Sequence, residues 1–209
     1  MKLFLASGNR HKQNEMQQLL PEYEICIPED ASIQFNPKET GTSFAENSLI
    51  KARALWSLIH EPVIADDSGL CVDALNGAPG IFTSRYAGPS YMQGLPDGKK
   101  IAQEEQNRLL IEQVNDIIDA ERTCHYTCAM TLLLSFDRYF IAQETFAGEL
   151  VKNIKDACGT GGFGYDPIVY LPQYKKTVAQ ISAEEKNLIS HRGKAVRAIA
   201  AILHTLKNA

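Results

Sequence analysis

Short apolar runs alternate with helical patterns along this 209-residue chain, and that alternation constrains its fold more than any other feature. Apolar and β-branched runs predict strands at residues 2–6, 23–27, 62–65, 122–135, 139–150 and 168–170. Helical periodicity separates these runs, at residues 10–20, 43–59, 99–118 and from about 190 onwards. Strands and helices in such a mixed order predict an α/β or α+β fold.

The helical pattern at 43–59 has two distinct faces. Its apolar residues recur three or four positions apart and predict the buried stripe: Ala45, Leu49, Ala52, Trp56 and Ile59. Asn47 and Lys51 fall on the opposite face, which is either a solvated surface or the wall of a cleft. Ser43 and Glu46 form a capping-box pattern, so the helix is expected to begin there.

Size and charge exclude several classes of function. The chain suits one large domain or two closely joined lobes, and no stretch approaches the ~20 apolar residues needed to span a bilayer. The opening segment 1–6 is too short for a signal peptide, so we expect a cytoplasmic protein without membrane association. The five cysteines contain no CxxC pair and are expected to be reduced. A net charge of −4 argues against nucleic-acid binding, although a local basic pocket can still bind phosphate.

Two adjacent acids, Asp66 and Asp67, end the apolar run at 62–65. Charged carboxylates at the end of a buried strand are costly unless something neutralises them. A divalent cation is the simplest neutraliser, because hard cations prefer carboxylate oxygens. The doublet therefore favours a metal site over the alternative, a carboxylate that caps the turn before Gly69.

Two segments are candidate anion sites. The segment 159–164 matches G-x-G-x-x-G, but a strand follows it, so it is not a dinucleotide fingerprint. It is either a tight structural loop or a loop that lets a ligand approach backbone N–H groups, with Phe163 and Tyr165 as stacking faces. The turn at 7–9 joins a strand to a helix whose first turn carries Lys12, which suits a phosphate or is an ordinary turn.

Lys186, His191 and Arg192 cluster around the start of the last predicted helix. A cation at a helix N-terminus opposes the helix dipole, so a ligand or an acidic partner is expected in preference to a solvated helix start. Carboxylates for a metal, scattered lysines, helix N-termini and a glycine loop together suit a nucleoside polyphosphate. Aromatic residues beside polar ones suit a purine base.

With these residues in view, the chain resembles the inosine/xanthosine triphosphate pyrophosphatases, which remove non-standard purine nucleotides from the precursor pool. Four blocks carry the resemblance, in the family's order and across nearly the whole chain. They are LASGNRHK at 5–12, GTSFAENSLIKARA at 41–54, IADDSGLCVDALNGAPGIFTSRYAG at 64–88, and 159–192 with its GTGGFGYDPI and EEKNLISHRG.

The resemblance implies an elongated, two-lobed α/β fold, in which a long twisted mixed β-sheet is flanked by helices around a central cleft. It implies that residues 1–209 form a single nucleotide pyrophosphatase domain and that the protein is a homodimer. It also implies a requirement for Mg²⁺ and hydrolysis of ITP, dITP or XTP to the monophosphate and pyrophosphate.

The matching positions carry the family's residue roles over to this chain. Asp67 would be the general base and would hold Mg²⁺ together with Glu39, which lies in a less closely matching loop. The residues that would surround the substrate are Ser7, Gly8, Asn9, Arg10, His11, Lys12, Lys51, Ser68, Phe163, Gly164, Tyr165, Asp166, Lys186, His191 and Arg192. The division of metal and base roles between Asp66 and Asp67 stays open.

The chain departs from the family pattern at two places, and two rival functions are open. Ser7 stands where many relatives have Thr, and the stretch 89–100 looks idiosyncratic. One rival is a pyrophosphatase of the same fold that acts on modified pyrimidine or methylated nucleotides, and the block 190–192 argues against it. Another is a catalytically silent nucleotide-binding regulator, against which the intact Asp66, Asp67 and Lys12 argue.

Overall fold

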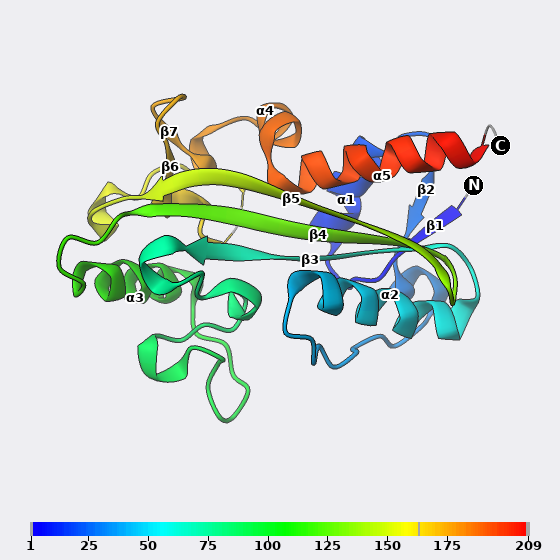
Figure 1. Cartoon of the computed structure of the whole chain (residues 1–209), viewed down its shortest axis with the longest axis horizontal. Helices are drawn as coiled ribbons and strands as arrows, with labels where there is room; N and C mark the ends of the chain where they lie inside the picture. The colour runs from blue at the N-terminus through cyan, green and yellow to red at the C-terminus, as the bar shows by residue number, and fades with distance from the viewer. Residues whose placement is uncertain (1, 163, 208–209) are drawn as a thin grey trace. The chain divides into compact units, whose positions relative to one another are not determined.

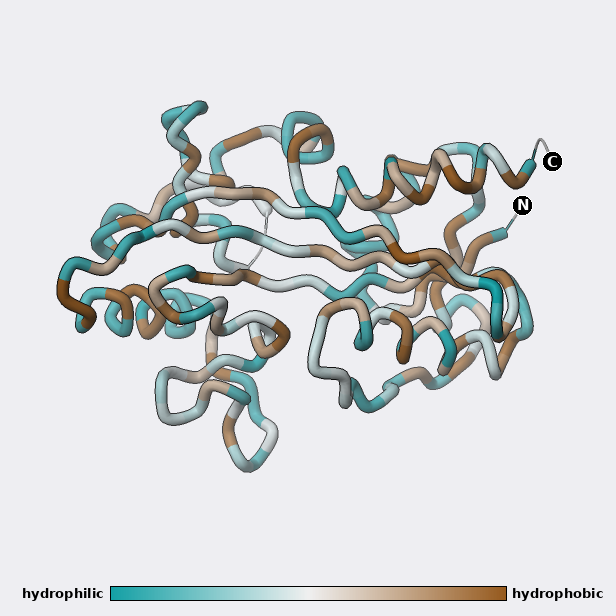
Figure 2. The backbone as a smooth tube through the Cα atoms, viewed as in Figure 1, coloured by the Kyte–Doolittle hydropathy of each residue, from teal (hydrophilic) through white to brown (hydrophobic). Residues whose placement is uncertain are grey.

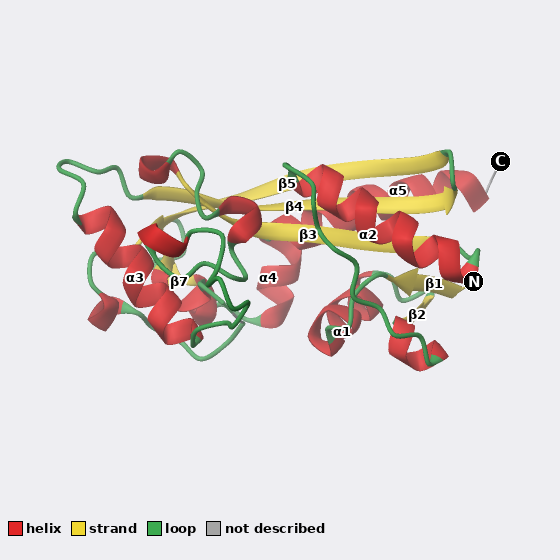
Figure 3. Cartoon of the chain, turned by 90° about the horizontal axis from the view of Figure 1, so that it is seen from below, coloured by secondary structure: helices red, strands yellow, loops and turns green. Residues whose placement is uncertain are grey.

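A computed structural model describes residues 2–162 and 164–207. The chain divides into two compact units: unit 1 is Met1–Asp67, Cys128–Glu144 and Ser190–Ala209, and unit 2 is Ser68–Thr127 and Thr145–Ile189. Seven strands follow the hydrogen-bonded order β2-β1-β3-β4-β5-β6-β7 (Figure 1, Figure 3). Three of them have residues in both units, namely β3 (Val63–Val72), β4 (Thr123–Ser135) and β5 (Arg138–Leu150).

The first three strands of unit 1 are parallel. β1 (Lys2–Leu5) lies between β2 (Glu24–Cys26) and β3 and pairs with both. Helix α1 (Arg10–Leu19) connects β1 to β2, and a segment containing α2 (Phe44–Ile59) connects β2 to β3. Parallel neighbours require crossover connections of this length, because a tight hairpin can only reverse the chain.

Two hydrophobic clusters cover the two faces of the sheet in unit 1. One packs Met16 of α1 and Val196 of α5 (His191–Lys207) against strand residues such as Leu3. The other packs Ala52 and Leu55 of α2 against residues of β3 and β4. Figure 1 accordingly shows α5 and α2 on opposite sides of the strands, and Figure 2 shows apolar and polar bands alternating along α5. Each helix therefore buries one stripe and leaves the other to solvent.

The carboxyl end of β1 is the place where the connections change faces. The α1 connection to β2 runs over one face, whereas the α2 connection to β3 runs over the other. In open α/β sheets, ligands bind outside the carboxyl ends of the strands at such a switch point. The residues that follow β1 are thus placed where this fold class provides a crevice.

The short strands of unit 2 form antiparallel pairs. β6 (Val169–Leu171) pairs antiparallel with β5 and with β7 (Lys176–Thr177). Helix α3 (Gln103–Asn115) buries Leu110, Ile111 and Val114 in the hydrophobic cluster of this unit, and α4 (Ala183–Ile189) is short. Within the described ranges, no helix is long and apolar enough to cross a membrane.

The predicted mixed α/β sheet is confirmed, and most of the predicted elements agree with the structure within a few residues. β3 is much longer than its predicted end at 65, because the residues after the acid doublet continue as a buried strand to Val72. The helix predicted at 99–118 spans only Gln103–Asn115. β7 was not predicted, since its two residues carry no periodic signal.

The predicted buried face of α2 is partly wrong. Ala52 is buried as predicted, but the other four members of the stripe are only half-buried. Asn47 and Lys51 are instead buried, at 0% and 8% exposure, together with Ser48 and Leu55. Polar partners account for the difference, since the Ser48 hydroxyl lies 2.6 Å from that of Thr131 on β4. Apolar periodicity cannot detect a helix face that is buried through polar contacts.

Candidate active site

The turn after β1 is tied to the start of α1 by its own side chains. Oδ1 of Asn9 accepts hydrogen bonds from the backbone N–H groups of His11 and Lys12, at 2.9 and 3.3 Å. Oγ of Ser7 accepts from the N–H of Asn9 at 3.1 Å. The N-cap therefore satisfies part of the helix start. A bound anion would be held here mainly by side-chain charge and less by the helix N–H groups.

A pocket of about 190 Å³ opens beside this turn, entirely within unit 1. Its lining residues are Ala6, Ser7, Gly8, Lys12, Phe35, Asn36, Pro37, Glu39, Lys51 and Asp66. Two lysines and two acids thus line one crevice at the switch point of the sheet. The pocket brings together five predicted site residues and Asp66. They come from the turn after β1, α1, the loop before α2, α2 and β3.

Asp66 and Asp67 have separate sets of partners because successive side chains of a strand point to opposite faces of the sheet. Asp66 faces α1 and α5. Both of its carboxylate oxygens lie 2.9 Å from Nζ of Lys12, and Oδ2 also accepts from Nε and Nη2 of Arg192 at 3.3 and 3.2 Å. Nη1 of Arg192 in turn donates to Glu15 of α1 at 2.7 Å. Two cations therefore neutralise this buried acid.

Asp67 faces α2. Its Oδ1 lies 2.9 Å from Nζ of Lys51, and its Oδ2 accepts from Nδ2 of Asn47 at 3.2 Å. Lys51 also reaches Oε1 of Glu39 at 3.1 Å. Asn47 is itself fixed, because its Oδ1 accepts from the N–H of Gly41 at 2.9 Å. The α2 face that was predicted to be a surface or a cleft wall thus orients Asp67.

The two acids differ in the ease with which they take a proton. Burial alone would raise the pKa of Asp66, but the attraction of Lys12 and Arg192 outweighs it and lowers the pKa far below its usual range. Burial raises the pKa of Asp67, with Glu39 and Asp66 adding to the rise, and Lys51 opposes this without cancelling it. Burial would lower the pKa of Lys51, but its acidic neighbours, led by Asp67, raise it, so Lys51 stays charged.

The chemistry of this donor set fits Mg²⁺. Among the described residues, no three His, Cys, Asp or Glu side chains form a metal cage. Mg²⁺ does not need one, because it commonly binds one or two carboxylates and takes its other ligands from phosphates and water. Oxygens of Glu39 and Asp67 both lie within 3.1 Å of the same cationic group, Nζ of Lys51. Two carboxylates that converge on one positive charge can also converge on a divalent cation.

Unit 2 contains a second buried charge cluster. Asp166 begins the turn that follows the glycine loop and is 3% exposed. Its Oδ2 lies 2.6 Å from Nζ of Lys186 in α4, and its Oδ1 accepts from the hydroxyl of Tyr126 at 3.0 Å. Gly164 has a positive φ of 69°, a backbone conformation that favours glycine. Two predicted substrate residues are therefore paired with one another in this unit.

The other predicted site residues have varied surroundings. Arg10 binds Glu29 and Asp30, at 3.0 and 2.7 Å, and does not line the pocket. His11 is exposed and also lies outside the pocket lining, whereas His191 is buried at the start of α5. Ser68 is half-buried in β3, and the buried Tyr165 donates its hydroxyl to the carbonyl of Thr83 at 3.2 Å. Phe163 lies outside the described residues.

Several residues of these clusters were not predicted as site residues. Asn47 had only its position opposite the apolar stripe to mark it, and Glu15 and Tyr126 had no signal of their own. Spacing could have indicated Glu15, since it lies three residues after Lys12 and on the same helix face. The pocket-lining loop at 35–37 has no local pattern that points to a ligand.

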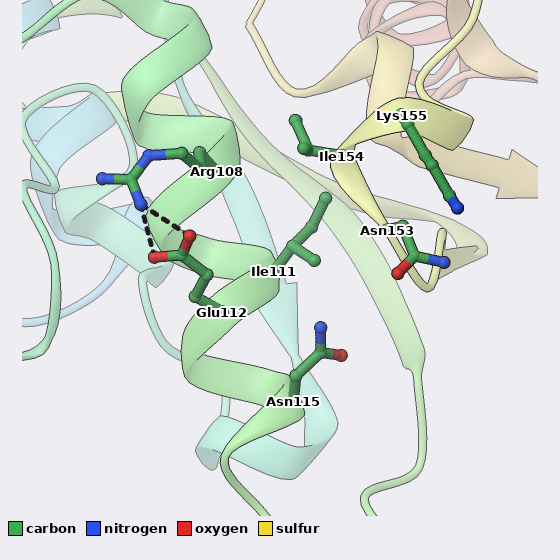
Figure 4. A pocket seen from close by; sticks show the side chains of 7 residues that line it. All are labelled: Arg108, Ile111, Glu112, Asn115, Asn153, Ile154 and Lys155. Carbon is green, nitrogen blue, oxygen red and sulfur yellow. Dashed lines mark hydrogen bonds and ion pairs between the residues drawn. The ribbon is translucent and has the colours of Figure 1, made fainter.

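A larger pocket, of about 330 Å³, lies in unit 2 between α3 and the turn Ile154–Asp156 (Figure 4). Its arginine, Arg108, donates to both oxygens of Glu112 at 2.5 and 2.7 Å and also binds Glu105. The Arg108 and Glu112 side chains are 42% and 52% exposed, so their charges are screened by water. The buried acids and lysines of unit 1 are better suited to chemistry than this exposed pair.

Comparison with known proteins gives consistent results. A family model described as the Ham1 family matches residues 3–202. A Treponema denticola protein described as a dITP/XTP pyrophosphatase is 43% identical over 200 residues, covering 96% of this chain and 97% of its own. A Streptomyces coelicolor protein of the same description is 41% identical, covering 98% of each chain. The structure of a HAM1 protein from Coxiella burnetii matches with a TM-score of 0.86 at 35% identity, covering 98% of this chain and 99% of that one.

Proposed function

Because the chain belongs to the Ham1 family, we propose that it hydrolyses the non-standard purine nucleoside triphosphates ITP, dITP and XTP to the monophosphate and pyrophosphate. It is thus a nucleoside triphosphate pyrophosphatase, a hydrolase of acid anhydrides that cleanses the nucleotide pool. The observation that carries this proposal is the unit 1 pocket, which is lined by Lys12, Lys51 and Asp66. Asp67, whose pKa is shifted in the opposite direction to that of Asp66, does not line the pocket but contacts its Lys51. Lysines suit a triphosphate, and a carboxylate that can take a proton suits the activation of water.

In the proposed reaction, a water oxygen attacks the α-phosphorus. The bond between that phosphorus and the oxygen bridging to the β-phosphate breaks, and pyrophosphate leaves with the bridging oxygen. The proton of the water passes to the carboxylate of Asp67, which suits this role because burial and its acidic neighbours raise its pKa. Asp66 is a poor base, because Lys12 and Arg192 hold its pKa far below the usual range despite its burial. This contrast favours Asp67 over Asp66 as the base when no metal ion is bound. A cation bound to Asp67 would lower its pKa, so the base and metal roles would have to be shared between its two oxygens.

Phosphate binding is assigned to the pocket beside the β1 turn. The ammonium groups of Lys12 and Lys51 offset the charge on phosphate oxygens. A Cβ on Gly8 would meet nothing within 4 Å, so the backbone there is open to a ligand. The turn residues that complete this assignment are Ser7, Gly8, Asn9, Arg10 and His11. Of these, Ser7 and Gly8 line the pocket, whereas Asn9, Arg10 and His11 do not.

Mg²⁺ is the proposed cofactor, held by Glu39 and Asp67. When bound, it supplies a Lewis acid that offsets charge on the triphosphate. The convergence of both carboxylates on Lys51 supports this assignment.

Recognition of the purine base is assigned to residues of unit 2. The donors of Lys186, fixed by Asp166, complement the O6 carbonyl of hypoxanthine or xanthine. The 6-amino group of adenine cannot accept such a hydrogen bond, so ATP would leave a donor without a partner. The remaining residues of this assignment in unit 2 are Ser68, Phe163, Gly164 and Tyr165. His191 and Arg192, which the resemblance also assigns to the substrate, belong to unit 1, where Arg192 is paired with Asp66 and Glu15.

The working assembly is proposed from the resemblance to the family. The protein would act as a cytoplasmic homodimer, with residues 1–209 of each chain forming one catalytic domain. A net charge of −4 supports a role that does not involve nucleic acid.

A nucleotide panel tests the proposed function. Pyrophosphate release is measured with ITP, dITP, XTP, ATP and GTP, with Mg²⁺ and after its removal by a chelator. We expect kcat/KM for the first three to exceed that for ATP by at least about 100-fold, the range that a hydrogen-bonding site can reach, whereas GTP carries the same O6 carbonyl and tests whether other groups of the base are also recognised. Equal rates for all five nucleotides would contradict base selectivity. Binding of ITP without pyrophosphate release would indicate the silent regulator.

A further inference from the structure

The hydroxyl of Tyr126 is a polar group within the hydrophobic cluster of unit 2. Tyr126 lies on β4, is 7% exposed and shares this cluster with residues such as Leu70 and Phe146. A buried hydroxyl costs free energy unless it is hydrogen-bonded. This one donates to Oδ1 of Asp166 at 3.0 Å. A phenylalanine ring would fill the same position in the core. What the hydroxyl adds is therefore its hydrogen bond to Asp166.

Different elements hold the two oxygens of Asp166. Tyr126 of β4 donates to Oδ1, and Lys186 of α4 donates to Oδ2 at 2.6 Å. The terminal torsion of an aspartate is broad, so a single donor leaves its carboxylate able to turn. Two donors from two elements fix the carboxylate plane. They thereby also fix the place of the Lys186 ammonium, whose side chain is 13% exposed.

The glycine loop at 159–164 lies directly on this ion pair. A Cβ at Gly162 would overlap Oδ2 of Asp166 and would lie 3.1 Å from Nζ of Lys186. The loop is anchored on both sides of this contact. The N–H of Gly161 donates to the carbonyl of Ala179 at 3.1 Å, and Nδ2 of Asn107 donates to the carbonyl of Gly164 at 3.4 Å. The ammonium of Lys186 therefore lies close to the backbone of Gly162.

We propose that Tyr126 is a positioning residue for recognition of the purine base, holding Asp166 so that Lys186 presents its ammonium at the glycine loop. This inference rests on the proposed function, which assigns Asp166 and Lys186 to the base. Burial and the adjacent Asp166 carboxylate raise the pKa of Tyr126 well above its ordinary value, so the phenol stays protonated and remains a donor.

Tyr126→Phe tests the inference, because it removes one oxygen and keeps the ring. With ITP and Mg²⁺, we expect KM to rise on the order of tenfold and kcat to stay within about twofold, the pattern of lost ground-state binding. Calorimetric titration with two ligands distinguishes binding of the base from binding of the phosphates. The Kd of inosine monophosphate, which carries the base, should rise on the order of tenfold. The Kd of inorganic tripolyphosphate, which lacks it, should stay within about twofold.

Tyr86→Phe is the matched control. Tyr86 is fully buried in the same hydrophobic cluster, and its hydroxyl donates to Oε1 of Gln113 at 2.6 Å. Both variants should lose similar thermal stability, but only Tyr126→Phe should raise KM. Equal changes of KM in the two variants, or an equal loss of tripolyphosphate and inosine monophosphate binding, would overturn the positioning role.

A double substitution tests whether Tyr126 acts through Asp166. In the background of Asp166→Ala, adding Tyr126→Phe should change KM by less than about twofold, because the group that Tyr126 holds is already absent. A full tenfold effect in that background would overturn the inference. The wild-type protein tests the proposed function separately: if it releases no pyrophosphate from ITP, that function fails. A normal wild-type rate with an unchanged KM in Tyr126→Phe overturns the inference alone.

Discussion

Replacing Asp66 with asparagine removes the charge that compensates the buried Arg192 and the half-buried Lys12. Asp66 is 1% exposed, and both of its oxygens lie 2.9 Å from Nζ of Lys12. Its Oδ2 also accepts two hydrogen bonds from the buried Arg192, at 3.2 and 3.3 Å. Asparagine keeps the shape of the side chain but carries no negative charge. The substitution therefore isolates the electrostatic part of the interaction.

The structure sets the size of the expected loss. Removing one member of a buried ion pair costs about 3–5 kcal/mol, because the remaining charge is left in a poor environment. Here Arg192 keeps Glu15 at 2.7 Å, and the Lys12 side chain is 19% exposed and can reach water. Both features relieve the remaining charges. We therefore expect the free energy of unfolding to fall by about 3 kcal/mol, the lower end of that range.

The loss should depend on pH in a particular direction. The pKa of Asp66 is lower in the folded state than the value of about 3.9 expected in the unfolded state. Its stabilisation is therefore fully present above the unfolded pKa and is lost as the pH falls towards the folded pKa. The difference between wild type and Asp66→Asn should stay constant from about pH 8 to 5. It should then shrink by about 1 kcal/mol between pH 4 and 3.

Urea unfolding at several pH values provides the measurement. The single tryptophan, Trp56, lies in α2 of unit 1 and reports the transition by its fluorescence. An unchanged m-value would show that the same surface is exposed in both proteins. A loss below about 1 kcal/mol at pH 7, or a difference that grows in acid, would refute the account of Asp66 as an anion held by two cations.

Three further predictions concern the site, the glycine loop and the assembly. Asp67→Asn should lower kcat for ITP by at least about 100-fold at saturating Mg²⁺, because an amide takes no proton, while the circular dichroism spectrum stays unchanged. A kcat within tenfold of wild type would contradict this prediction. Gly162→Ala should lower the free energy of unfolding in urea by about 1–3 kcal/mol more than Gly164→Ala does. Both glycines have positive φ, but only a Cβ at position 162 would overlap Asp166. Equal losses in the two variants would exclude that overlap. Light scattering at micromolar concentration should give twice the 23.2 kDa monomer mass, and the monomer mass itself would contradict the dimer.

The sequence predicts the strand and helix order well, because apolar periodicity is local. It also indicates Lys12 beside the first helix start, since the turn and helix follow directly from β1. The residues that neutralise the charge of Asp66 could not be predicted in the same way. Adjacent acids suggested a metal, whereas the structure pairs Asp66 with Lys12 and Arg192, residues 54 and 126 positions away. Such partners are brought together only by tertiary packing, which leaves no local pattern.

Buried polar residues are difficult to predict from the sequence for the same reason, because their partners come from distant parts of the chain. The helix position of Lys51 left a solvated surface and a cleft wall open, and only the structure shows it buried between Glu39 and Asp67. Tyr126 reads as an ordinary core aromatic, and only the fold shows that its hydroxyl meets Asp166. In each case the burial is tolerated because a partner of opposite or complementary chemistry is supplied from another element.

The two-residue period of β3 has a consequence for how this protein can vary. Inserting or deleting one residue between Val63 and Asp66 would shift the strand by one position and turn each carboxylate to the other side of the sheet. A deletion would bring Asp67 to the position that faces Lys12 and Arg192, and an insertion would bring Asp66 to the position that faces Lys51. In either case the other acid would lie two positions along its new face from the cations there, so a change of length would disrupt both sets of contacts at once. Homologues should therefore differ freely in the apolar side chains of this stretch while keeping its number of residues constant.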